Sequence, residues 1–469
     1  MFRVFQHRTS GTHFVELFAD GVLCFIAALL SAATLAHPVP GVSPLMQVIS
    51  PVILFSAFSF ALVMALLYSF VGLYRHRNLG LVPMFLRIGF AFVIGGYITY
   101  LAIKYVRYDG YASSLVGYSL VYLMGGLAIY RGAAWGIRQM VGTRRVLIVG
   151  TGPDARQVCT DLRAGGHWAG YDVVGFFPTA EQTDRGALRG AAHIFDTRLR
   201  MVDLVREHKI SEIIVAVREQ RGGGVPMDQL LECRIGGVPI MDLAYFYERT
   251  KAEVPVDSLK ASWLVYGDGF VQGRAREFTK RVFDIVSSSM LLLLGAPVML
   301  LTALAIRMDS VGPILYRQER VGLGGQGFMC IKFRSMRTDA EKDGVARWAS
   351  KNDSRITRVG AFIRKTRIDE LPQLFSVLKG EMSMVGPRPE RPSFVAQLRE
   401  QIPFYDLRHT VKPGLTGWAQ VRYAYGASLE DARKKHQFDL YYVKNNSLLL
   451  DLQVLIETVS VVLFREGAH

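Results

Sequence analysis

Two adjacent carboxylates, Asp369 and Glu370, follow a cluster of cations formed by Arg364, Lys365 and Arg367. Neighbouring residues on a helix point about 100° apart, so the two carboxylates cannot act as one bidentate clamp. They can divide the work instead, one attacking an electrophile while the other holds a metal ion or handles a proton. The nearby cations would keep both acids ionised and attract an anionic substrate. The alternative is an exposed acid pair at a helix start, where its charge complements the helix dipole.

The composition indicates a basic membrane protein. Half of the 469 residues are hydrophobic, and the formal net charge is +15. Such a basic excess is typical of proteins that bind nucleic acid, anionic lipid or an anionic substrate. There is no nucleic-acid-binding motif, and the cations concentrate beside apolar segments and in the last third of the chain, so lipid and phosphate are the expected partners. The four cysteines have no CxxC spacing, which argues against a disulfide framework or a zinc site.

Four apolar runs predict a transmembrane region over residues 1–135. The runs are 14–36, 51–73, 84–103 and 112–130, each long enough to span a bilayer. The first run is too long for a signal peptide and lacks a small-residue cleavage site. Cations lie before the first run, between the second and third, and after the fourth, whereas the outer loop 37–50 has none; the second outer loop carries Lys104 and Arg107. This balance predicts that both ends of the four-helix bundle face the cytoplasm.

A fifth apolar stretch, 282–306, carries cations at both ends: Lys280 and Arg281 before it and Arg307 after it. Pro297 lies inside the stretch, and proline removes a helical hydrogen bond and kinks the chain. A re-entrant helix hairpin, broken at Pro297 and returning to the same membrane face, accounts for both features. An ordinary kinked fifth span is the alternative, and it would place the rest of the chain outside.

Residues 143–250 alternate between strand and helix patterns, which predicts a cytoplasmic α/β domain of the Rossmann-like, doubly wound class. The expected strands are 145–150, 171–177, 212–217 and 238–241, and the expected helices are 154–166 and 198–208. Gly150-x-Gly152-x-x-Ala155 follows a strand and opens a helix, as a dinucleotide fingerprint requires. The second strand, however, ends in Phe176–Pro178 without the expected acidic residue. We therefore expect a structural or oligomerising domain that could support a homodimer, and no NAD.

Residues 278–465 carry six motifs in a fixed order. The motifs are Lys280-Arg281-x-x-Asp284, Gly312 to Gly322, Lys332 to Met336, Asp369-Glu370-x-Pro372-Gln373, Ser383 to Glu390, and Lys412 to Trp418. In these motifs the chain resembles the bacterial sugar transferase family, the monotopic phosphoglycosyl transferases that load a sugar phosphate onto a polyprenyl phosphate carrier. With its membrane bundle and middle domain it resembles the long-form subfamily of exopolysaccharide and O-antigen initiation, in the bacterial inner membrane. Arg367 departs from the pattern, because many relatives carry a small or uncharged residue there.

The resemblance implies a monotopic α/β catalytic domain over 278–469, preceded by a linker over 251–277. It implies transfer of a hexose 1-phosphate from a UDP-sugar to polyprenyl (undecaprenyl) phosphate, with release of UMP. Asp369 would attack the β-phosphorus and carry a covalent phosphosugar, while Glu370, together with Asp369, would hold Mg²⁺ or handle protons. Uniting two anions demands positive charge. The candidate substrate-binding residues are Arg388, Lys332, Arg334, Arg317 and Gln318.

Arg388 has the most restricted backbone of this set, because it lies between Pro387 and Pro389. A fixed guanidinium recognises phosphate at a lower entropy cost, although a turn with a surface arginine is the alternative. The glycine-rich segment 321–327 joins the candidate strands 314–318 and 328–333. A phosphate-binding loop and a plain tight turn both remain open for it.

Two other functions compete with the transferase. Membrane-bound NAD-dependent nucleotide-sugar dehydratases or epimerases need a Tyr-x-x-x-Lys pair, and Tyr247 and Lys251 match that spacing. Tyr100 and Lys104 match it too, inside a membrane run, so the spacing is not specific. A non-catalytic scaffold for polysaccharide assembly would have no need for the complete charged motif set. The role of Asp439 stays open.

The last apolar pattern, 448–464, fits either an interfacial helix or a core helix. The sequence does not reveal which sugar is transferred.

Overall fold

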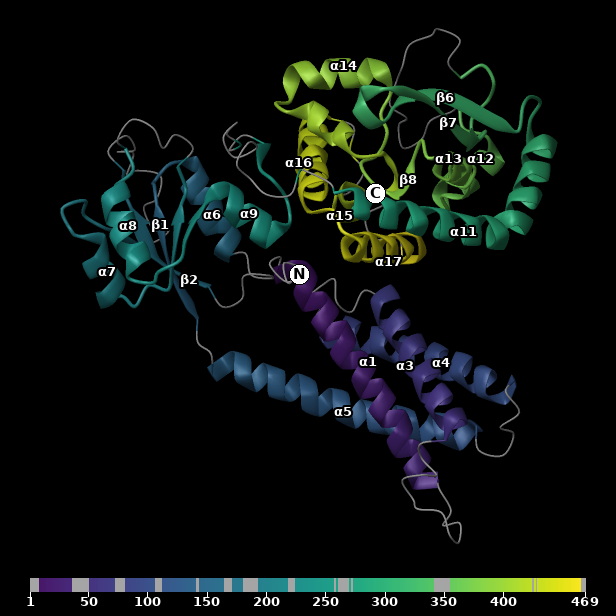
Figure 1. Ribbon diagram of the computed structural model, residues 1–469, viewed down its shortest axis with the longest axis horizontal. Coiled ribbons are helices and arrows are strands. Elements are labelled where there is room, and N and C mark those ends of the chain that lie inside the picture. The colour runs from purple at the N-terminus through teal and green to yellow at the C-terminus, as the bar shows by residue number, and fades with distance from the viewer. Residues whose placement is uncertain are drawn as a thin grey trace. The chain divides into compact units, whose positions relative to one another are not determined.

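The computed structural model (Figure 1) is divided into two compact units, Met1–Thr250 and Lys251–His469. It describes residues 8–35, 50–71, 81–105, 112–140, 143–163, 171–179, 193–217, 224–256, 259, 270, 273–340, 355–423, 426 and 428–464.

The first unit begins with helices of membrane-spanning length. They are α1 (Arg8–Leu35), α3 (Pro51–Phe70), α4 (Leu81–Tyr105) and α5 (Ala112–Met140). Each overlaps one of the four apolar runs, and each is long and apolar enough to cross a membrane. The start of α3 shows how the sequence sets a boundary: Pro51 occupies the first turn, and the Ser50 side chain accepts a hydrogen bond from the Ile53 backbone N–H at 3.4 Å.

Apolar side chains lie on both the inside and the outside of this bundle. Ala27 and Ala57 are buried between helices together with larger side chains such as Phe60, whereas Phe58 and Val93 are exposed on the outer surface. Small interior residues let apolar helices approach closely, and large apolar exterior residues match a lipid environment. The apolar outer surface supports a membrane location for the bundle.

A five-stranded parallel sheet follows in the same unit, with strand order β3-β2-β1-β4-β5. Its strands are β1 (Arg144–Val149), β2 (Tyr171–Phe177), β3 (His193–Ile194), β4 (Glu212–Val215) and β5 (Ile240–Asp242). The four expected strands all form within two residues of their expected starts. The two-residue strand β3 was not expected, because so short a segment has no readable alternation.

Helices cover both faces of this sheet. They are α6 (Pro153–Arg163), α7 (Met201–Glu207), α8 (Met227–Ile235) and α9 (Leu243–Lys251). Alternate residues of β1 point to opposite faces, so Val146 and Ile148 pack with α6 and α9 while Leu147 and Val149 pack with α7 and α8. The parallel sheet with helices on both faces agrees with the prediction for this segment.

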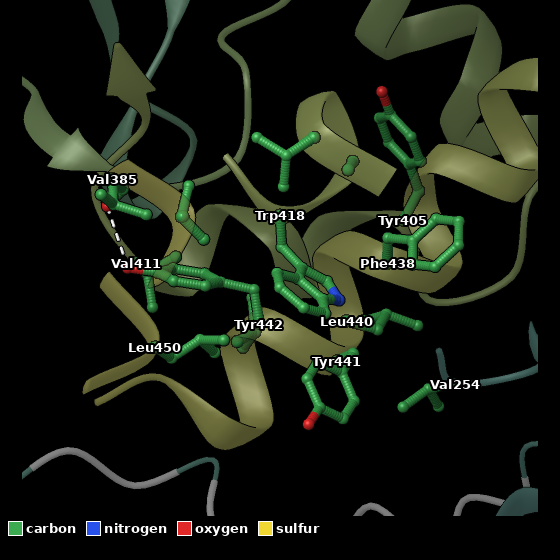
Figure 2. Close-up of a cluster of buried hydrophobic side chains, with 14 of the residues drawn as sticks. Val254, Val385, Tyr405, Val411, Trp418, Phe438, Leu440, Tyr441, Tyr442 and Leu450 are labelled. Atoms are coloured by element: carbon green, nitrogen blue, oxygen red, sulfur yellow. Dashed lines mark hydrogen bonds between the residues drawn. The ribbon is translucent and has the colours of Figure 1, made fainter. Parts of the chain in front are cut away.

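The second unit surrounds a large aromatic core. Its main elements are α11 (Arg274–Asp309), β6 (Leu315–Val321), β7 (Gly327–Phe333), α12 (Arg358–Lys365), α13 (Gln373–Lys379), β8 (Ser383–Val385), α14 (Pro392–Gln401), β9 (Gly414–Thr416), α15 (Trp418–Arg422), α16 (Leu429–Asn445) and α17 (Leu448–Phe464). Figure 2 shows Trp418, Tyr441 and Tyr442 in this core, and the Tyr442 hydroxyl donates to the Val385 carbonyl at 2.9 Å. The predicted strands around 321–327 form the antiparallel pair β6–β7.

The fifth apolar stretch, 282–306, lies within the 36-residue helix α11, which contains Pro297. The second half of α11 exposes large apolar side chains such as Leu293 (77%) and Leu300 (74%). Helix α11 is also long and apolar enough to cross a membrane. Figure 1 shows α11 changing direction along its length. The re-entrant hairpin broken at Pro297 stays a prediction.

Part of the predicted linker 251–277 belongs to the core of the second unit. Ala252, Val254 and Val256 are buried there, and the Trp418 indole N–H donates to the Ala252 carbonyl at 2.9 Å. We therefore expect a truncated chain 251–469 to be clearly more stable than a chain 270–469. Losing two buried valines costs about 3–6 kcal/mol. Thermal unfolding in detergent measures the difference, and equal melting temperatures for the two truncations would contradict it.

Candidate active site

The acid pair lies in a short 3₁₀ helix, η5 (Ile368–Glu370), between α12 and α13. Arg367 precedes it in the left-handed conformation, with φ 59°, which turns the chain sharply after α12. Asp369 and Glu370 are only 8% and 7% exposed. The alternative of an exposed acid pair at a helix start is therefore wrong. Two adjacent buried carboxylates require charge partners.

Cations from distant segments hold Glu370. Its Oε1 accepts from Lys332 Nζ at 3.2 Å and from Arg388 Nη2 at 2.8 Å, and Arg367 Nη1 lies 3.8 Å away. Burial disfavours the charged form, but these three cations outweigh it and hold the pKa of Glu370 well below its usual range. The expectation that cations keep Glu370 ionised agrees with this geometry. The contacts come from Lys332, Arg388 and Arg367 rather than from the preceding helix.

Asp369 has a different environment. Its Oδ1 is buried and has no hydrogen-bond partner among the described residues. Burial, together with the neighbouring charge of Glu370, raises the pKa of Asp369 to about 6. The two acids therefore differ in acidity, and the expectation that both are ionised holds for Asp369 only above that pH. Above that pH Asp369 is a carboxylate with an uncommitted oxygen, which is the state a nucleophile needs.

The structure separates the five candidate substrate-binding residues. Lys332 and Arg388 meet at Glu370. Arg334 is buried and donates to the Ser310 carbonyl at 2.7 Å and the Val311 carbonyl at 2.9 Å, so it holds the end of α11. Those hydrogen bonds favour a structural role for Arg334 over substrate binding.

The two remaining candidates lie on β6. Arg317 is exposed there, and Gln318 donates to the Tyr316 hydroxyl at 2.9 Å. Gln318 also accepts from Arg320 Nη2 at 2.6 Å. Neither residue is brought to the acid pair by a described contact, so substrate binding by Arg317 and Gln318 stays a prediction.

The motif Lys280-Arg281-x-x-Asp284 acts as an anchor for the site. Asp284 Oδ1 accepts from Ser383 Oγ and the Met384 N–H, both at 3.0 Å. Lys280 Nζ donates to Asp451 at 2.7 Å and to the Val385 carbonyl at 3.2 Å. The bonds to Ser383, Met384 and Val385 join α11 to β8, the strand that leads to Arg388, and the bond to Asp451 joins α11 to α17. The motif was visible in the sequence, but its anchoring role depends on partners about 100 to 170 residues away.

Two other open features now have a location. Asp439 is buried on α16 and forms an ion pair with Arg408 at 2.9 Å. Of α17, Leu450 and Val454 are buried in the aromatic core while Leu448 and Leu452 are exposed, so one face of this helix is a core face.

The geometry gives no support to hydride chemistry at Tyr247. Its hydroxyl donates to Asp161 Oδ2 at 3.3 Å, within the sheet domain.

A buried carboxylate pair contacted by cations, in a unit that also carries a helix apolar enough to cross a bilayer, fits an enzyme that acts on phosphates at a membrane. The family model described as bacterial sugar transferase matches residues 275–465. The chain is similar to the UDP-glucose:undecaprenyl-phosphate glucose-1-phosphate transferase of Xanthomonas campestris pv. campestris, with 32% identity over 75% of this chain and 73% of that protein. The chain belongs to the bacterial sugar transferase family.

Other relatives differ in the sugar that their names specify. The UDP-N-acetylgalactosamine-undecaprenyl-phosphate N-acetylgalactosaminephosphotransferase of Aeromonas hydrophila is 42% identical over 51% of this chain, and the match spans 56% of that protein's length. The undecaprenyl-phosphate galactose phosphotransferase of Salmonella typhimurium is 32% identical over 70% of this chain and 69% of its own length.

Proposed function

We propose that this chain transfers a hexose 1-phosphate from a UDP-sugar to undecaprenyl phosphate, releases UMP, and so initiates exopolysaccharide or O-antigen synthesis. The observation that carries the proposal is the buried pair itself: Asp369 with an uncommitted carboxylate oxygen beside Glu370, which Lys332 and Arg388 hold ionised. The names of the relatives agree on undecaprenyl phosphate as acceptor but differ on the sugar.

The proposed reaction has two displacement steps at one phosphorus. A carboxylate oxygen of Asp369 attacks the β-phosphorus, and the bond from that phosphorus to the bridging oxygen breaks, so that UMP leaves with the electron pair. A phosphate oxygen of the lipid then attacks the same phosphorus. The bond to Asp369 breaks, the carboxylate is restored, and the sugar phosphate leaves on the lipid as a diphosphate.

Positive charge at the pair supports this chemistry. Lys332 and Arg388 both contact Glu370, so their cationic groups lie next to the attacking carboxylate. Charge that is already in place where negative charge develops is a large contributor to catalysis. We assign Lys332 and Arg388 to the phosphates of the two substrates.

A magnesium ion fits the oxygen donors of this site. Among the described residues there is no group of three or more His, Cys, Asp or Glu side chains that could hold a metal. Mg²⁺ commonly binds through one or two carboxylates, with waters and substrate phosphates completing its shell. Asp369 and Glu370 would hold it, and it would neutralise phosphate charge when bound.

The test of the function is product analysis with purified protein in detergent. Undecaprenyl phosphate is supplied with UDP-glucose, UDP-galactose or UDP-N-acetylgalactosamine in separate reactions. We expect UMP release with at least one donor, together with a lipid-linked diphosphate sugar. Release of UDP would instead indicate transfer of the sugar without its phosphate. No nucleotide release with any donor would contradict the proposal.

We infer that the sheet domain is Rossmann-like and has a structural or oligomerising role. The order β3-β2-β1-β4-β5 supports this, because it corresponds to five strands of the doubly wound dinucleotide-binding order. The second strand ends at Phe177 without an acidic residue for a ribose, so we expect no NAD. A homodimer through this domain is part of the same proposal, and the mass of the detergent-solubilised protein tests it.

We also propose that α11 enters and leaves the inner membrane on the cytoplasmic side. Cysteines at Thr279 and Val311, in a background without native cysteines, should both resist impermeant thiol reagents in intact cells and react after lysis. Val311 is 91% exposed, so its reactivity reports the compartment. Labelling of position 311 alone in intact cells would show that the helix crosses the bilayer.

The variant Pro297→Leu tests the cause of the re-entry. Leucine restores a helical hydrogen bond and removes a ring clash worth about 3 kcal/mol. We expect a fraction of molecules to insert as a true span, with position 311 labelled from outside and activity reduced in proportion.

A further inference from the structure

We propose that the buried pair Arg408–Asp439 is a positioning device that holds the backbone of Arg388, and through it the guanidinium that contacts Glu370. The proposal rests on the proposed transferase function. It assigns a role to two residues that lie outside the carboxylate pair and its cations.

Arg408 is the link between the pair and the site. Its Nη2 donates to Asp439 Oδ2 at 2.9 Å and to the carbonyl of Arg388 at 2.8 Å, and its Nη1 donates to the Tyr405 hydroxyl at 2.7 Å. Arg388 Nη2 in turn reaches Glu370 Oε1 at 2.8 Å. A continuous chain of contacts therefore runs from α16 to the catalytic acid pair.

The neighbouring peptide is held in the same way. Arg320 Nη1 on β6 donates to the Pro389 carbonyl at 3.2 Å. Pro387 and Pro389 restrict the backbone dihedral angles of the segment, but neither proline hydrogen-bonds to the carbonyls of Arg388 and Pro389. Two arginines from separate elements thus hold consecutive carbonyls, which sets both the place and the direction of the Arg388 side chain.

Burial makes each member of the pair dependent on the other. Burial raises the pKa of Asp439 to about 6, although Arg408 favours its charged form. Tyr405, Glu390 and His436 also face Arg408. A buried ion pair is weak evidence for stability, because well-packed apolar residues often serve as well. Nη2 joins the Asp439 carboxylate to the Arg388 carbonyl while Nη1 holds the Tyr405 hydroxyl, and this use of both nitrogens gives the arginine a geometric reason to be there.

A double-mutant cycle tests the coupling. We expect Asp439→Asn to lower kcat/KM for UMP release by about 100-fold, the effect of a small misplacement of a catalytic group. We expect Arg388→Ala to lower it by about 100- to 1000-fold. If Asp439 acts through Arg388, the double variant should be no slower than Arg388→Ala alone.

The division of the loss between kcat and KM supplies a readout that a folding defect does not move. A fraction of unfolded protein lowers the apparent kcat and leaves the KM of the folded enzyme unchanged. Arg388 is assigned to a substrate phosphate, so its displacement should raise the KM for the UDP-sugar in Asp439→Asn and in Arg388→Ala alike. Activity is expressed per folded enzyme.

Arg408→Lys serves where Asp439→Asn does not fold. It keeps a positive charge beside Asp439, but a single ammonium cannot reproduce the rigid plane in which Nη2 holds the Asp439 carboxylate and the Arg388 carbonyl while Nη1 holds the Tyr405 hydroxyl. We expect the same loss and the same rise in the KM for the UDP-sugar. Arg399→Gln is the matched control: Arg399 pairs with Asp406 at 2.7 Å, both half-exposed, and the variant should keep wild-type kinetics.

The outcomes separate the two proposals. Additive effects in the double variant, with an unchanged KM for the UDP-sugar in Asp439→Asn and an active wild type, would remove the positioning role and leave the transferase function intact. A wild type that releases no UMP from any donor would remove both.

Discussion

Asp369→Asn should lower the rate of UMP release by at least about 10⁴-fold, because an amide cannot act as the nucleophile that the carboxylate provides. The substitution preserves the shape of a side chain that is only 8% exposed, so the protein should remain folded and membrane-bound. Burial and the charge of Glu370 raise the pKa of Asp369 to about 6, so the ionised Asp369 carboxylate destabilises the folded protein. The neutral amide removes this repulsion, which favours folding.

Covalent labelling measures the same prediction directly. Wild type incubated with a UDP-sugar labelled in the β-phosphate, without lipid, should retain label on the peptide that contains Asp369. Asp406→Asn is the matched control, because Asp406 is half-exposed and its only described partners are Arg399 and His409. Label on another residue, or turnover by Asp369→Asn, would overturn the nucleophile assignment.

Gly414→Ala should prevent stable folding of the second unit. A Cβ at Gly414 would overlap the backbone of Gly386 and the Thr416 carbonyl. The Gly414 N–H donates to the Pro387 carbonyl at 2.9 Å, and the Gly386 N–H donates to Thr416 at 2.9 Å, so neither strand can move without losing a bond. Overpacking of flexible side chains costs about 1–3 kcal/mol, and this overlap with rigid backbone should cost more.

Gly273→Ala provides the matched control for the glycine substitution. A Cβ there meets no atom within 4 Å, and the residue has an ordinary φ of −77°. We expect wild-type yield in membranes and an unchanged unfolding temperature in detergent for this variant. A Gly414→Ala protein that unfolds at the same temperature as Gly273→Ala would show that β8 and β9 can separate without cost.

The sequence by itself determined the local elements and the residues of the acid pair. The apolar runs predict α1, α3, α4 and α5, because membrane-length hydrophobicity is a property of contiguous residues. The strand expected from Arg145 onward appears as β1, which begins one residue earlier, because a run of buried apolar residues is also contiguous in the sequence. The order of the six charged motifs likewise identified the family without any knowledge of contacts.

Only the tertiary structure decided how these residues work together. Lys332 reaches Glu370 across 38 positions and Arg388 across 18, while the nearer Arg364 and Lys365 make no described ion pair with it. Arg334, which the sequence predicts to bind substrate, holds the end of α11. Asp439, for which the sequence predicts no role, is linked to Arg388 through Arg408. The sequence specifies the type and the charge of each side chain. Which donor meets which acceptor, and how far burial shifts each pKa, depends on segments that meet only after the chain has folded.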